Sequence, residues 1–553
     1  MKRSWLLLVL ALQVILYWNG LWGGFVFDDR FLIVDTMGQL NLWDIWTTGL
    51  WIDKVDQANF YRPIFSTSIW IDQNLFGGWA IGYHWHSLVW HWVNLLLFTQ
   101  LCQKILPRPQ RVIAVLIFAT HPLLSEIVFW TAARNDLIAL TFMLLFLNSY
   151  WKGVQTSSGF PEGVQVLNAK RLSMLGFLFL AAVLSKEVSL ILLIPVLASI
   201  RKVTGAKYLL AVQLGVVILI FSWRSLIGVS SPEVDGALIG IAVQKTLPFL
   251  VDGLGRLGFP WRLSPATSLA WLDIEIPHLM LALGVVFYLV WRMVQDTRNL
   301  WWGLWLFGSV AVAFPVVVYT GNTGDRYWTV AVMVWSLLIA QAVPKKWFWI
   351  PIPFWMVMIF LRGNAYESDR TFWTVEKQMN PNPYTAVSLA IIDYNEQRYE
   401  AALKGFYEGY SADPPHLMGC DSFVSSVLVV NGPEAAIQAH DWILSRGCPN
   451  STALQTLNTI LLAKLGQWTK VRSNLELISV ESDQRLTVVR LLSDWKADDK
   501  AAFCNGIKEV PNQFWSTISA QLKALSPQDF LKLSQTNCVL NRNDEGPSNE
   551  GSQ

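Results

Sequence analysis

Ionisable side chains stand at the ends of several apolar stretches of this sequence. A charge near the centre of a bilayer costs about 2.5–3.5 kcal/mol on insertion scales, so such residues are candidates for function. The carboxylates are Asp28, Asp29 and Glu126, and the cations are Arg62, Arg134, Lys186 and Arg326. The cations could hold an anionic phosphate, which arginine can do with two parallel hydrogen bonds. The adjacent carboxylates could accept a proton from an incoming hydroxyl or hold a divalent cation, although no cofactor is firmly indicated.

Other polar residues accompany these charges in short motifs. We assign a supporting role to Tyr61, His91, Asn94, His121, Asp136, Glu187, Asp325 and Tyr327. Taken singly, the motifs have plainer interpretations: Asp28-Asp29 is more often a solvated helix cap, and Asp325-Arg326 is equally well an ion pair between helices. The histidines of the stretch 84–91 do not predict a metal site, because His86 points away from His84 on a helix.

The apolar stretches that position these residues are long enough to cross a bilayer. About 20 apolar residues span the hydrocarbon core as a helix, because every backbone polar group is then bonded within the segment. We predict about eleven spans, at residues 4–22, 84–104, 111–130, 135–151, 171–186, 188–200, 208–223, 276–294, 300–319, 327–343 and 347–361. The apolar segment 237–256 carries Lys245, Asp252 and Arg256, and we interpret it as a membrane-surface or re-entrant helix.

Lysine and arginine residues set the orientation of these spans. With the N-terminus inside, the short inner loops are basic; Arg201, Lys202 and Lys207, for example, follow the sixth span. Basic inner loops satisfy the positive-inside rule. An odd number of spans then puts the C-terminal part on the outer face, and every candidate charge lies at the outer membrane boundary. This convergence from distant segments is the main argument for a site.

The composition supports an integral membrane protein of two domains. Of the 553 residues, 53% are hydrophobic and 15% are charged, against about 25% charged in soluble proteins. The net charge of +2 gives no reason to expect a nucleic-acid partner. We therefore expect a membrane domain over 1–361, with a first outer loop at 23–83, and a water-exposed domain over 362–540. The polar tail 541–553 is expected to be disordered.

The water-exposed domain has a weak 34-residue helical repeat. The stretch from Pro383 to Pro414 places small and aromatic residues, such as Ala402 and Phe406, as in a tetratricopeptide hairpin, and the pattern returns at Ala436. Such hairpins bury their faces only when they stack, so the fold predicted for the whole chain is mostly α: a polytopic membrane domain followed by a tetratricopeptide-like solenoid. A helical bundle without repeats is the alternative.

Four of the five cysteines fall in this C-terminal domain, at Cys420, Cys448, Cys504 and Cys538. An even number of cysteines in an oxidising outer compartment suggests up to two disulfides, in any of three connectivities. Four buried free thiols are the alternative. Cys102 is expected near the inner face as an ordinary core residue.

The motifs, taken in order, resemble the transmembrane-and-tetratricopeptide-repeat O-mannosyltransferases and their bacterial relatives, in the GT-C class of glycosyltransferases. The matching stretches are Phe25–Arg30, Tyr61–Pro63, His91–Asn94, His121–Glu126, Arg134–Leu137, Leu184–Glu187 and Asp325–Tyr327. The resemblance covers about residues 20–480, and the order of the motifs is more specific than any one of them.

This resemblance implies a GT-C-like membrane fold and inverting sugar transfer from a polyprenyl- or dolichyl-phosphate donor at the outer face. Asp28 or Asp29 would be the base or a metal ligand, and Glu126 a supporting carboxylate. Arg134, Lys186 and Arg326 would hold the lipid phosphate. The repeats would dock an acceptor or partner protein. We expect a bacterial inner membrane with a periplasmic C-terminal domain, or the endoplasmic reticulum membrane with a lumenal one if the chain is eukaryotic.

Two other functions fit the same sequence. The chain could be a non-catalytic envelope scaffold whose repeats recruit partners, although the retained acidic and basic residues argue against this. It could also be a polymerase or ligase of envelope polysaccharides. A transporter is less consistent, because no charge lies clearly in the middle of a span and no inverted repeat is seen.

Overall fold

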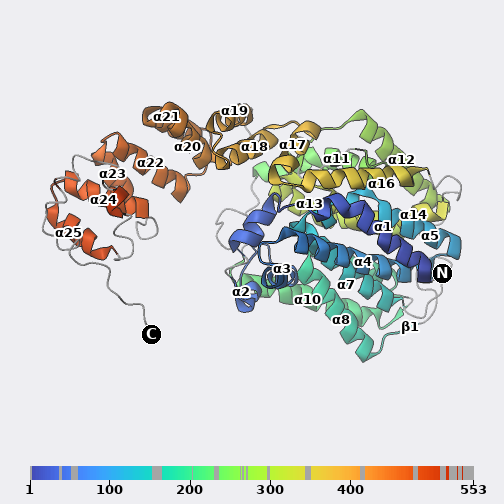
Figure 1. Cartoon of the computed structure of the whole chain (residues 1–553). Helices are drawn as coiled ribbons and strands as arrows, with labels where there is room; N and C mark the ends of the chain where they lie inside the picture. The colour runs from blue at the N-terminus through green and yellow to red at the C-terminus, as the bar shows by residue number, and fades with distance from the viewer. Residues whose placement is uncertain are drawn as a thin grey trace. The chain divides into compact units, whose positions relative to one another are not determined.

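The computed structural model divides into two compact units, Met1–Asn382 and Pro383–Gln553, which we describe separately (Figure 1). It describes residues 3–36, 40–50, 60–151, 165–201, 203–229, 236–261, 263, 267–269, 272–295, 299–342, 350–411, 418–476, 484–510, 518–521, 523, 532 and 539. The predicted disordered tail 541–553 lies outside these residues.

The first unit consists of helices and two short β-ladders in its described part. The helices are α1 (Arg3–Leu21), η1 (Arg30–Thr36), α2 (Leu42–Thr47), α3 (Pro63–Phe76), α4 (Ala80–Ile105), α5 (Arg108–Thr120), η3 (Pro122–Leu124), α6 (Glu126–Phe129), η4 (Thr131–Ala133), α7 (Arg134–Tyr150), α8 (Ala169–Ser185), η5 (Glu187–Leu192), α9 (Leu193–Ala198), α10 (Ala206–Leu226), α11 (Gly236–Gly258), α12 (Ile276–Gln295), α13 (Asn299–Thr320), η7 (Asp325–Trp328), α14 (Thr329–Ala342), α16 (Pro351–Arg362), η8 (Gly363–Tyr366) and α17 (Asp369–Met379). Strand β1 (Gln165–Val166) pairs in parallel with β2 (Val203–Thr204), and β3 (Thr267–Ser268) pairs antiparallel with β4 (Asn322–Thr323).

A helical segment occupies the described part of each predicted span. Among the described helices, three are long and apolar enough to cross a membrane: Ala206–Leu226, Ile276–Gln295 and Leu300–Thr320. The pair Arg108–Thr120 and Pro122–Phe129 is a fourth candidate. The protein is therefore an integral membrane protein, whereas the number of eleven spans stays a prediction.

The third predicted span is not straight. Its two parts, α5 and the segment Pro122–Phe129, meet at a bend of 48°. Pro122 cannot donate to the preceding turn and disfavours helical backbone at His121, which explains the break there. The imidazole of His121 accepts a hydrogen bond from the Leu123 amide, which caps the new turn. Glu126 consequently lies past the break, at the start of α6, rather than at the end of a continuous span.

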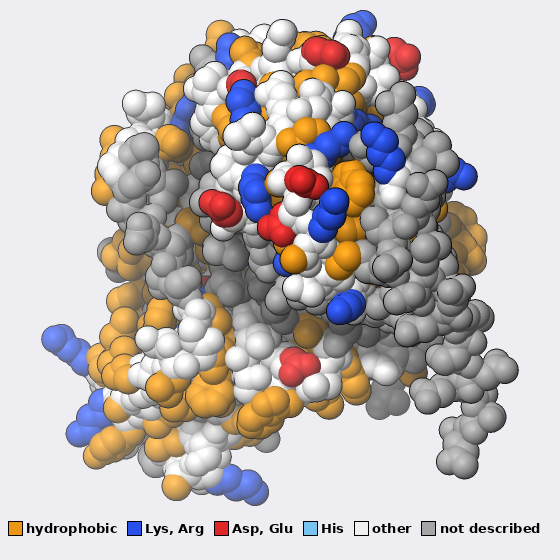
Figure 2. Space-filling model, turned by 90° about the vertical axis from the view of Figure 1, so that its left-hand side faces the viewer, with side chains coloured by type: hydrophobic (Ala, Val, Ile, Leu, Met, Phe, Trp, Pro, Cys, Tyr) orange, Lys and Arg blue, Asp and Glu red, His pale blue; other side chains and the backbone are white. Residues whose placement is uncertain are grey.

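The outside of the first unit is apolar where helices face outward. On α10, Ile218, Leu219 and Leu226 are 66%, 61% and 79% exposed. Hydrophobic side chains cover much of the lower part of the face seen in Figure 2, with Lys and Arg side chains at its edge. Soluble proteins rarely expose such continuous apolar patches, so this surface suits contact with lipid. In the interior, α14 is buried on all sides from Thr329 to Leu338.

The ambiguous segment 237–256 forms one helix, α11, which contains Pro248 and packs against α12, α13 and α14. It is not among the helices that qualify as spans by length and composition. Its interpretation as a surface or re-entrant helix stays a prediction. Its Arg256 has a clear role in packing, because it forms an ion pair with Asp325 of η7 that is described below.

The domain boundary lies later than the expected position, 361. Helix η8 contacts α1, α16 and α17, so the chain leaves the first unit only at Asn382. Glycine residues allow η8 to approach α1 and the residues after it closely. A Cβ on Gly363 would lie 2.7 Å from the backbone nitrogen of Gly20, and one on Gly23 would lie 2.2 Å from the carbonyl oxygen of Tyr366.

The second unit consists of helices in its described part, and each helix contacts the next along the chain. These are α18 (Pro383–Asn395), α19 (Tyr399–Tyr410), α20 (Cys420–Asn431), α21 (Pro433–Ser445), α22 (Thr452–Lys464), α23 (Trp468–Leu475), α24 (Gln484–Lys496) and α25 (Lys500–Glu509). Ala402 and Ala436, one repeat apart in the sequence, are both fully buried in one core with Phe406. Hairpins of this kind agree with the predicted repeat, but a tetratricopeptide solenoid stays a prediction.

One disulfide of the second unit joins Cys420 to Cys448. Cys504 is also disulfide-bonded, and Cys538 lies outside the described residues. The prediction of disulfides in this domain is thus confirmed, and the alternative of four free thiols is wrong. Cys102 is a buried free thiol, as expected.

Candidate active site

The two adjacent aspartates after α1 have different environments. Asp29 is fully buried, and its carboxylate accepts hydrogen bonds from the backbone amides of Ala132 (2.6 Å), Thr131 (3.4 Å) and Val26 (3.5 Å). Burial raises the pKa of Asp29 to about 8, while the three amides act in the opposite direction. Asp28, in contrast, is half-buried. Asp29 therefore fixes the loop to η4, just before α7, whereas Asp28 keeps part of its surface exposed.

The backbone just before Asp28 is strained. Phe27 has a φ of +52°, a conformation that residues other than glycine rarely adopt and that is often found at functional sites. Its amide donates to the carboxylate of Asp369 at the start of α17 (2.8 Å). Its ring stacks on Trp130 and Phe372 at centroid distances of 5.3 and 6.1 Å. These contacts hold Asp28 in one position.

Glu126 and Arg326 form the centre of a buried network of charges. The Arg326 guanidinium donates to Glu126 (2.6 Å), which also accepts from the Arg326 backbone amide (3.1 Å). Next to them, Asp325 pairs with Arg362 (2.7 Å) and Arg256 (2.8 Å). A buried charge is tolerated when it is paired and hydrogen-bonded, so these ion pairs tie α6, α11, η7 and α16 together.

Two of the four predicted phosphate-binding cations meet at Tyr327, and a third lies beside one of them. The Arg326 guanidinium and the Lys186 ammonium lie 4.6 and 5.3 Å from the centroid of the Tyr327 ring. Arg62 pairs with Glu187 (2.8 Å), the residue next to Lys186. Lys186 itself pairs with Asp136 at the start of α7. Since each of these cations has a carboxylate partner, an incoming phosphate would compete with Glu126, Asp136 or Glu187 for it.

Arg134, the fourth predicted cation, has a different position. Its side chain is fully buried and donates to Ser87, Ser68, Asp72 and the Tyr83 carbonyl. A guanidinium has five N–H donors, so little of its capacity remains for a ligand. Arg134 therefore holds α3, α4 and α7 together, and its occupied donors argue against its predicted role in binding the lipid phosphate.

Several supporting residues also connect helices. Asn94 donates to the Leu137 carbonyl and accepts from Thr141, which joins α4 to α7. The Tyr61 hydroxyl donates to the Trp46 carbonyl and accepts from the Trp223 indole. The other ring nitrogen of His121 lies 3.3 Å from the Leu257 carbonyl, at the end of α11.

His91 is fully buried and packs against Tyr17 and Phe118, and neither of its ring nitrogens has a hydrogen-bond partner in the part of the chain that the structure describes. It is therefore a core residue rather than part of the charged network.

The aspartate pair does not fit a divalent cation well. Both carboxylate oxygens of Asp29 accept backbone amides, which leaves Asp28 as the one acidic ligand of the pair. Within the described ranges, no three His, Cys, Asp or Glu side chains gather in a way that could hold a metal. We assign no step to a metal.

Four charged residues with these contacts were not chosen from the sequence as site residues. Asp72 lies in α3, within what we expected to be an outer loop, and Arg362 lies one residue past the last predicted span. Arg256 lies on α11, and in the sequence its charge indicates only that the segment 237–256 is not an ordinary membrane span. Asp369 lies beyond the expected domain boundary. Only for Arg362 and Arg256 did the sequence carry a signal, namely a charge at the end of an apolar stretch.

The fold and the site together define an integral membrane protein with a buried charged network beside a strained aspartate loop. No family model matches the chain. Part of the chain is similar to protein O-mannosyl-transferase TMTC3 from Mus musculus, with 29% identity over 26% of this chain and 16% of that protein. The human TMTC3 protein is 29% identical over 32% of this chain and 20% of its own length. Protein O-mannosyl-transferase Tmtc1 from Drosophila melanogaster is 31% identical over 25% of this chain and 17% of its own length.

The resemblance to this family that the motifs indicate is thus confirmed by sequence similarity over part of the chain. The chain covers a fifth or less of the length of these three relatives. Among solved structures, ArnT from Cupriavidus metallidurans, bound to undecaprenyl phosphate, matches with a TM-score of 0.40 and 14% identity, over 81% of this chain and 82% of that one. A likeness at this level carries no argument about this protein.

Proposed function

We propose that this protein is a glycosyltransferase that moves a sugar from a polyprenyl-phosphate donor to a protein hydroxyl at the outer face of the membrane. The observation that supports this best is the meeting of Lys186 and Arg326 at Tyr327, with Arg62 held next to Lys186 by Glu187, close to the Asp28 loop. Trp130 connects the two groups, because its ring stacks on Phe27 and lies 4.5 Å from the Arg326 guanidinium.

In the proposed reaction Asp28 accepts the proton of the acceptor hydroxyl. The hydroxyl oxygen then attacks the anomeric carbon of the sugar from the side opposite the phosphate, and the bond between that carbon and the phosphate oxygen breaks. The lipid phosphate leaves with a new negative charge, which Arg62, Lys186 and Arg326 stabilise. Attack from the opposite side inverts the configuration at the anomeric carbon.

The names of the relatives, protein O-mannosyl-transferases, suggest mannose as the sugar and a serine or threonine hydroxyl as the acceptor. We further propose that the second unit docks the acceptor or a partner protein in the periplasm or the lumen. The Cys420–Cys448 disulfide supports an oxidising compartment.

A glycan comparison tests the proposal. Extracytoplasmic proteins from cells with and without this gene are compared by glycopeptide mass spectrometry, and we expect hexose-bearing peptides to disappear in the deletion strain. Complementation with Asp28→Asn should not restore them. A scaffold function predicts instead that Asp28→Asn complements fully, and a polysaccharide polymerase predicts a change in polymer length with unchanged glycopeptides.

A further inference from the structure

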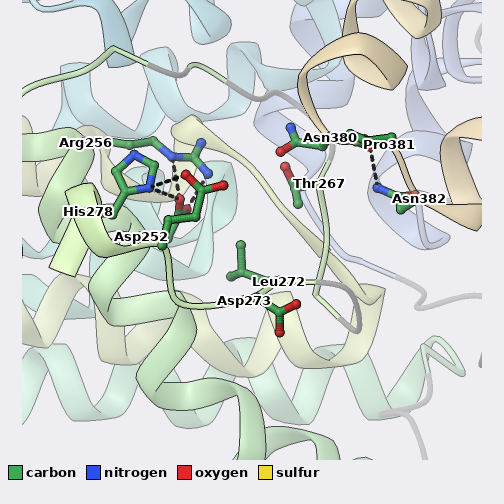
Figure 3. Close-up of a pocket in the computed structure, with 10 residues that line it drawn as sticks. Asp252, Arg256, Thr267, Leu272, Asp273, His278, Asn380, Pro381 and Asn382 are labelled. Carbon is green, nitrogen blue, oxygen red and sulfur yellow. Dashed lines mark hydrogen bonds and ion pairs between the residues drawn. The ribbon is translucent and has the colours of Figure 1, made fainter.

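A polar cavity of about 160 Å³ lies in the first unit, between the end of α11, the start of α12 and the residues that follow α17 (Figure 3). Figure 3 shows Asp252, Arg256 and His278 on one side of this space, with Thr267 and Asn380 facing them. Cavities of about 150 Å³ accept a benzene-sized molecule in other proteins. The cavity is therefore large enough for one six-membered ring.

The inner wall of the cavity is polar and held in place by its own contacts. Asp252, Arg256, Thr267 and His278 are all more than 90% buried. The guanidinium of Arg256 pairs with Asp252, four residues earlier on the same helix, and with Asp325 at 2.8 Å. Groups fixed in this way need little reorganisation when a ligand binds, which favours specific recognition.

His278 presents a hydrogen-bond donor toward the carboxylates of the cavity. The Trp261 indole N–H donates to its Nε2 atom at 2.9 Å, so this nitrogen is the acceptor of the ring. An indole nitrogen can only donate, and the hydrogen of a neutral imidazole must then lie on Nδ1. That atom is 3.5 Å from Glu275 and 3.7 Å from Asp252. The cavity therefore offers both donors and acceptors close together.

The charges of the lining disfavour an anionic ligand. Among the described residues, three carboxylates (Asp252, Asp273 and Glu275) line the cavity with one guanidinium, that of Arg256, whose charge is already shared between two carboxylates. Lys245 is not among the lining residues and contacts Asp273 at 3.7 Å. A phosphate or a uronic acid would be repelled here, whereas neutral hydroxyl groups can donate to carboxylates and accept from imidazole and amide N–H groups.

The cavity is linked to the candidate active site by one side chain. Arg256 lines the cavity and donates to Asp325, whose other oxygen contacts Arg362 at 2.7 Å. Arg362 in turn donates to Ser125, the neighbour of Glu126. A ring bound in the cavity would consequently lie beside the network in which we place the lipid phosphate.

We propose that this cavity binds one neutral pyranose ring through its hydroxyl groups. The inference deepens the proposed function, from which it takes mannose as the ring to test. The ring is either the sugar of the lipid donor or a sugar already carried by the acceptor.

The experiment measures binding of methyl α-D-mannopyranoside to the full-length protein in nanodiscs by saturation-transfer NMR titration. We expect saturable binding that weakens about tenfold in Glu275→Gln, where a neutral hydrogen bond replaces a charge-assisted one, and in Asn380→Ala, where one hydrogen bond to the ligand is lost. The matched control is Glu434→Gln, an exposed carboxylate of the second unit, which should bind like the wild type. Glu275 lies at the open side of the cavity and is 38% exposed, so its variant should fold.

Mannose 6-phosphate provides the charge test. It should bind at least tenfold more weakly than the neutral glycoside, and the double variant Asp273→Asn/Glu275→Gln should reduce this difference. The proposal is overturned by the absence of saturable binding, by unchanged affinity in Glu275→Gln and Asn380→Ala, or by equal binding of the phosphorylated sugar.

Competition identifies the source of the ring. Displacement of the glycoside by polyprenyl-phosphate mannose, but not by polyprenyl phosphate, assigns the cavity to the donor sugar. Displacement by neither lipid assigns it to a sugar on the acceptor, and displacement by both contradicts the proposal, because the lipid phosphate would then fill the cavity. Since no transfer is measured, failure of the proposed activity would leave this result intact.

Discussion

The carboxylate of Asp369 accepts a hydrogen bond from the backbone amide of Phe27 at 2.8 Å, across 342 positions of sequence. The bond connects α17, which follows the last predicted span, to the loop that follows the first predicted span. It also stabilises the left-handed backbone of Phe27, directly before Asp28. The position of the proposed base thus depends on a residue that lies just before the second unit.

Replacement of Asp369 by alanine should lower kcat for sugar transfer and change KM for the donor little. A hydrogen bond to a charged group is worth about 1.5–3 kcal/mol, so we expect a loss of about 10- to 100-fold. Asp369→Asn keeps an oxygen that can accept the Phe27 amide and should retain most of the activity.

The control for this variant is Asp441→Ala, whose carboxylate is 75% exposed in the second unit. Equal activity of Asp369→Ala and Asp441→Ala would show that the contact does not position Asp28. A KM increase without a change in kcat would point instead to donor binding.

Asp29 should make the stability of the protein depend on pH. Burial raises its pKa to about 8 from 3.8, so the folded state favours the protonated form. The protonated carboxyl adds its full contribution to the free energy of unfolding below pH 4. This contribution is lost as the pH rises to 8, by at most about 1.4 kcal/mol per pH unit. Thermal melts of the wild type and of Asp29→Asn are measured from pH 5 to 9. The difference in Tm, wild type minus variant, should decrease up to pH 8 and then stay constant. A constant difference would show that Asp29 has an ordinary pKa.

The cations around Tyr327 and the buried Arg134 should respond differently to substitution. The neutralised pair Lys186→Gln/Asp136→Asn removes a cation without leaving an unpaired buried carboxylate, so it should raise KM for the lipid donor at least tenfold and change Tm little. Arg134→Gln removes the guanidinium from the buried Asp72, which keeps its contact with the His86 imidazole, and should lower Tm strongly, because a broken buried pair costs about 3–5 kcal/mol. Both are measured on purified protein, by donor titration and by thermal melts. A stable Arg134→Gln protein with a raised KM would return Arg134 to the phosphate site.

The sequence predicted the helical segments and most of the charged residues of the network, because apolar length and misplaced charges are local signals. It did not predict their pairing. Nothing local distinguishes Arg134, whose donors are consumed by α3 and α4, from Arg326, which lies beside Tyr327. Asp72 was missed because the amphipathic helix α3 was interpreted as part of a loop. Asp369 was missed because its role depends on a contact with Phe27, which no pattern in either segment records.

The Cys420–Cys448 disulfide gives a direct test of orientation. In intact spheroplasts the second unit should be reached from outside, so after reduction a membrane-impermeant maleimide should label these cysteines, and before reduction it should not. The buried Cys102 serves as the internal control, because it should stay unlabelled in both conditions. Labelling without reduction would mean free thiols, and labelling only after lysis would place the second unit in the cytoplasm.

The most direct measurement is sugar transfer by purified Asp28→Asn protein from radiolabelled polyprenyl-phosphate mannose to a serine- and threonine-rich peptide, with Asp441→Asn as the matched control. General-base catalysis by a positioned side chain contributes about 10²- to 10⁴-fold, so the Asp28 variant should lose at least 100-fold in kcat while its Tm and donor KM stay near those of the wild type. Transfer by Asp28→Asn at the rate of Asp441→Asn would contradict the assignment of this loop as the catalytic centre.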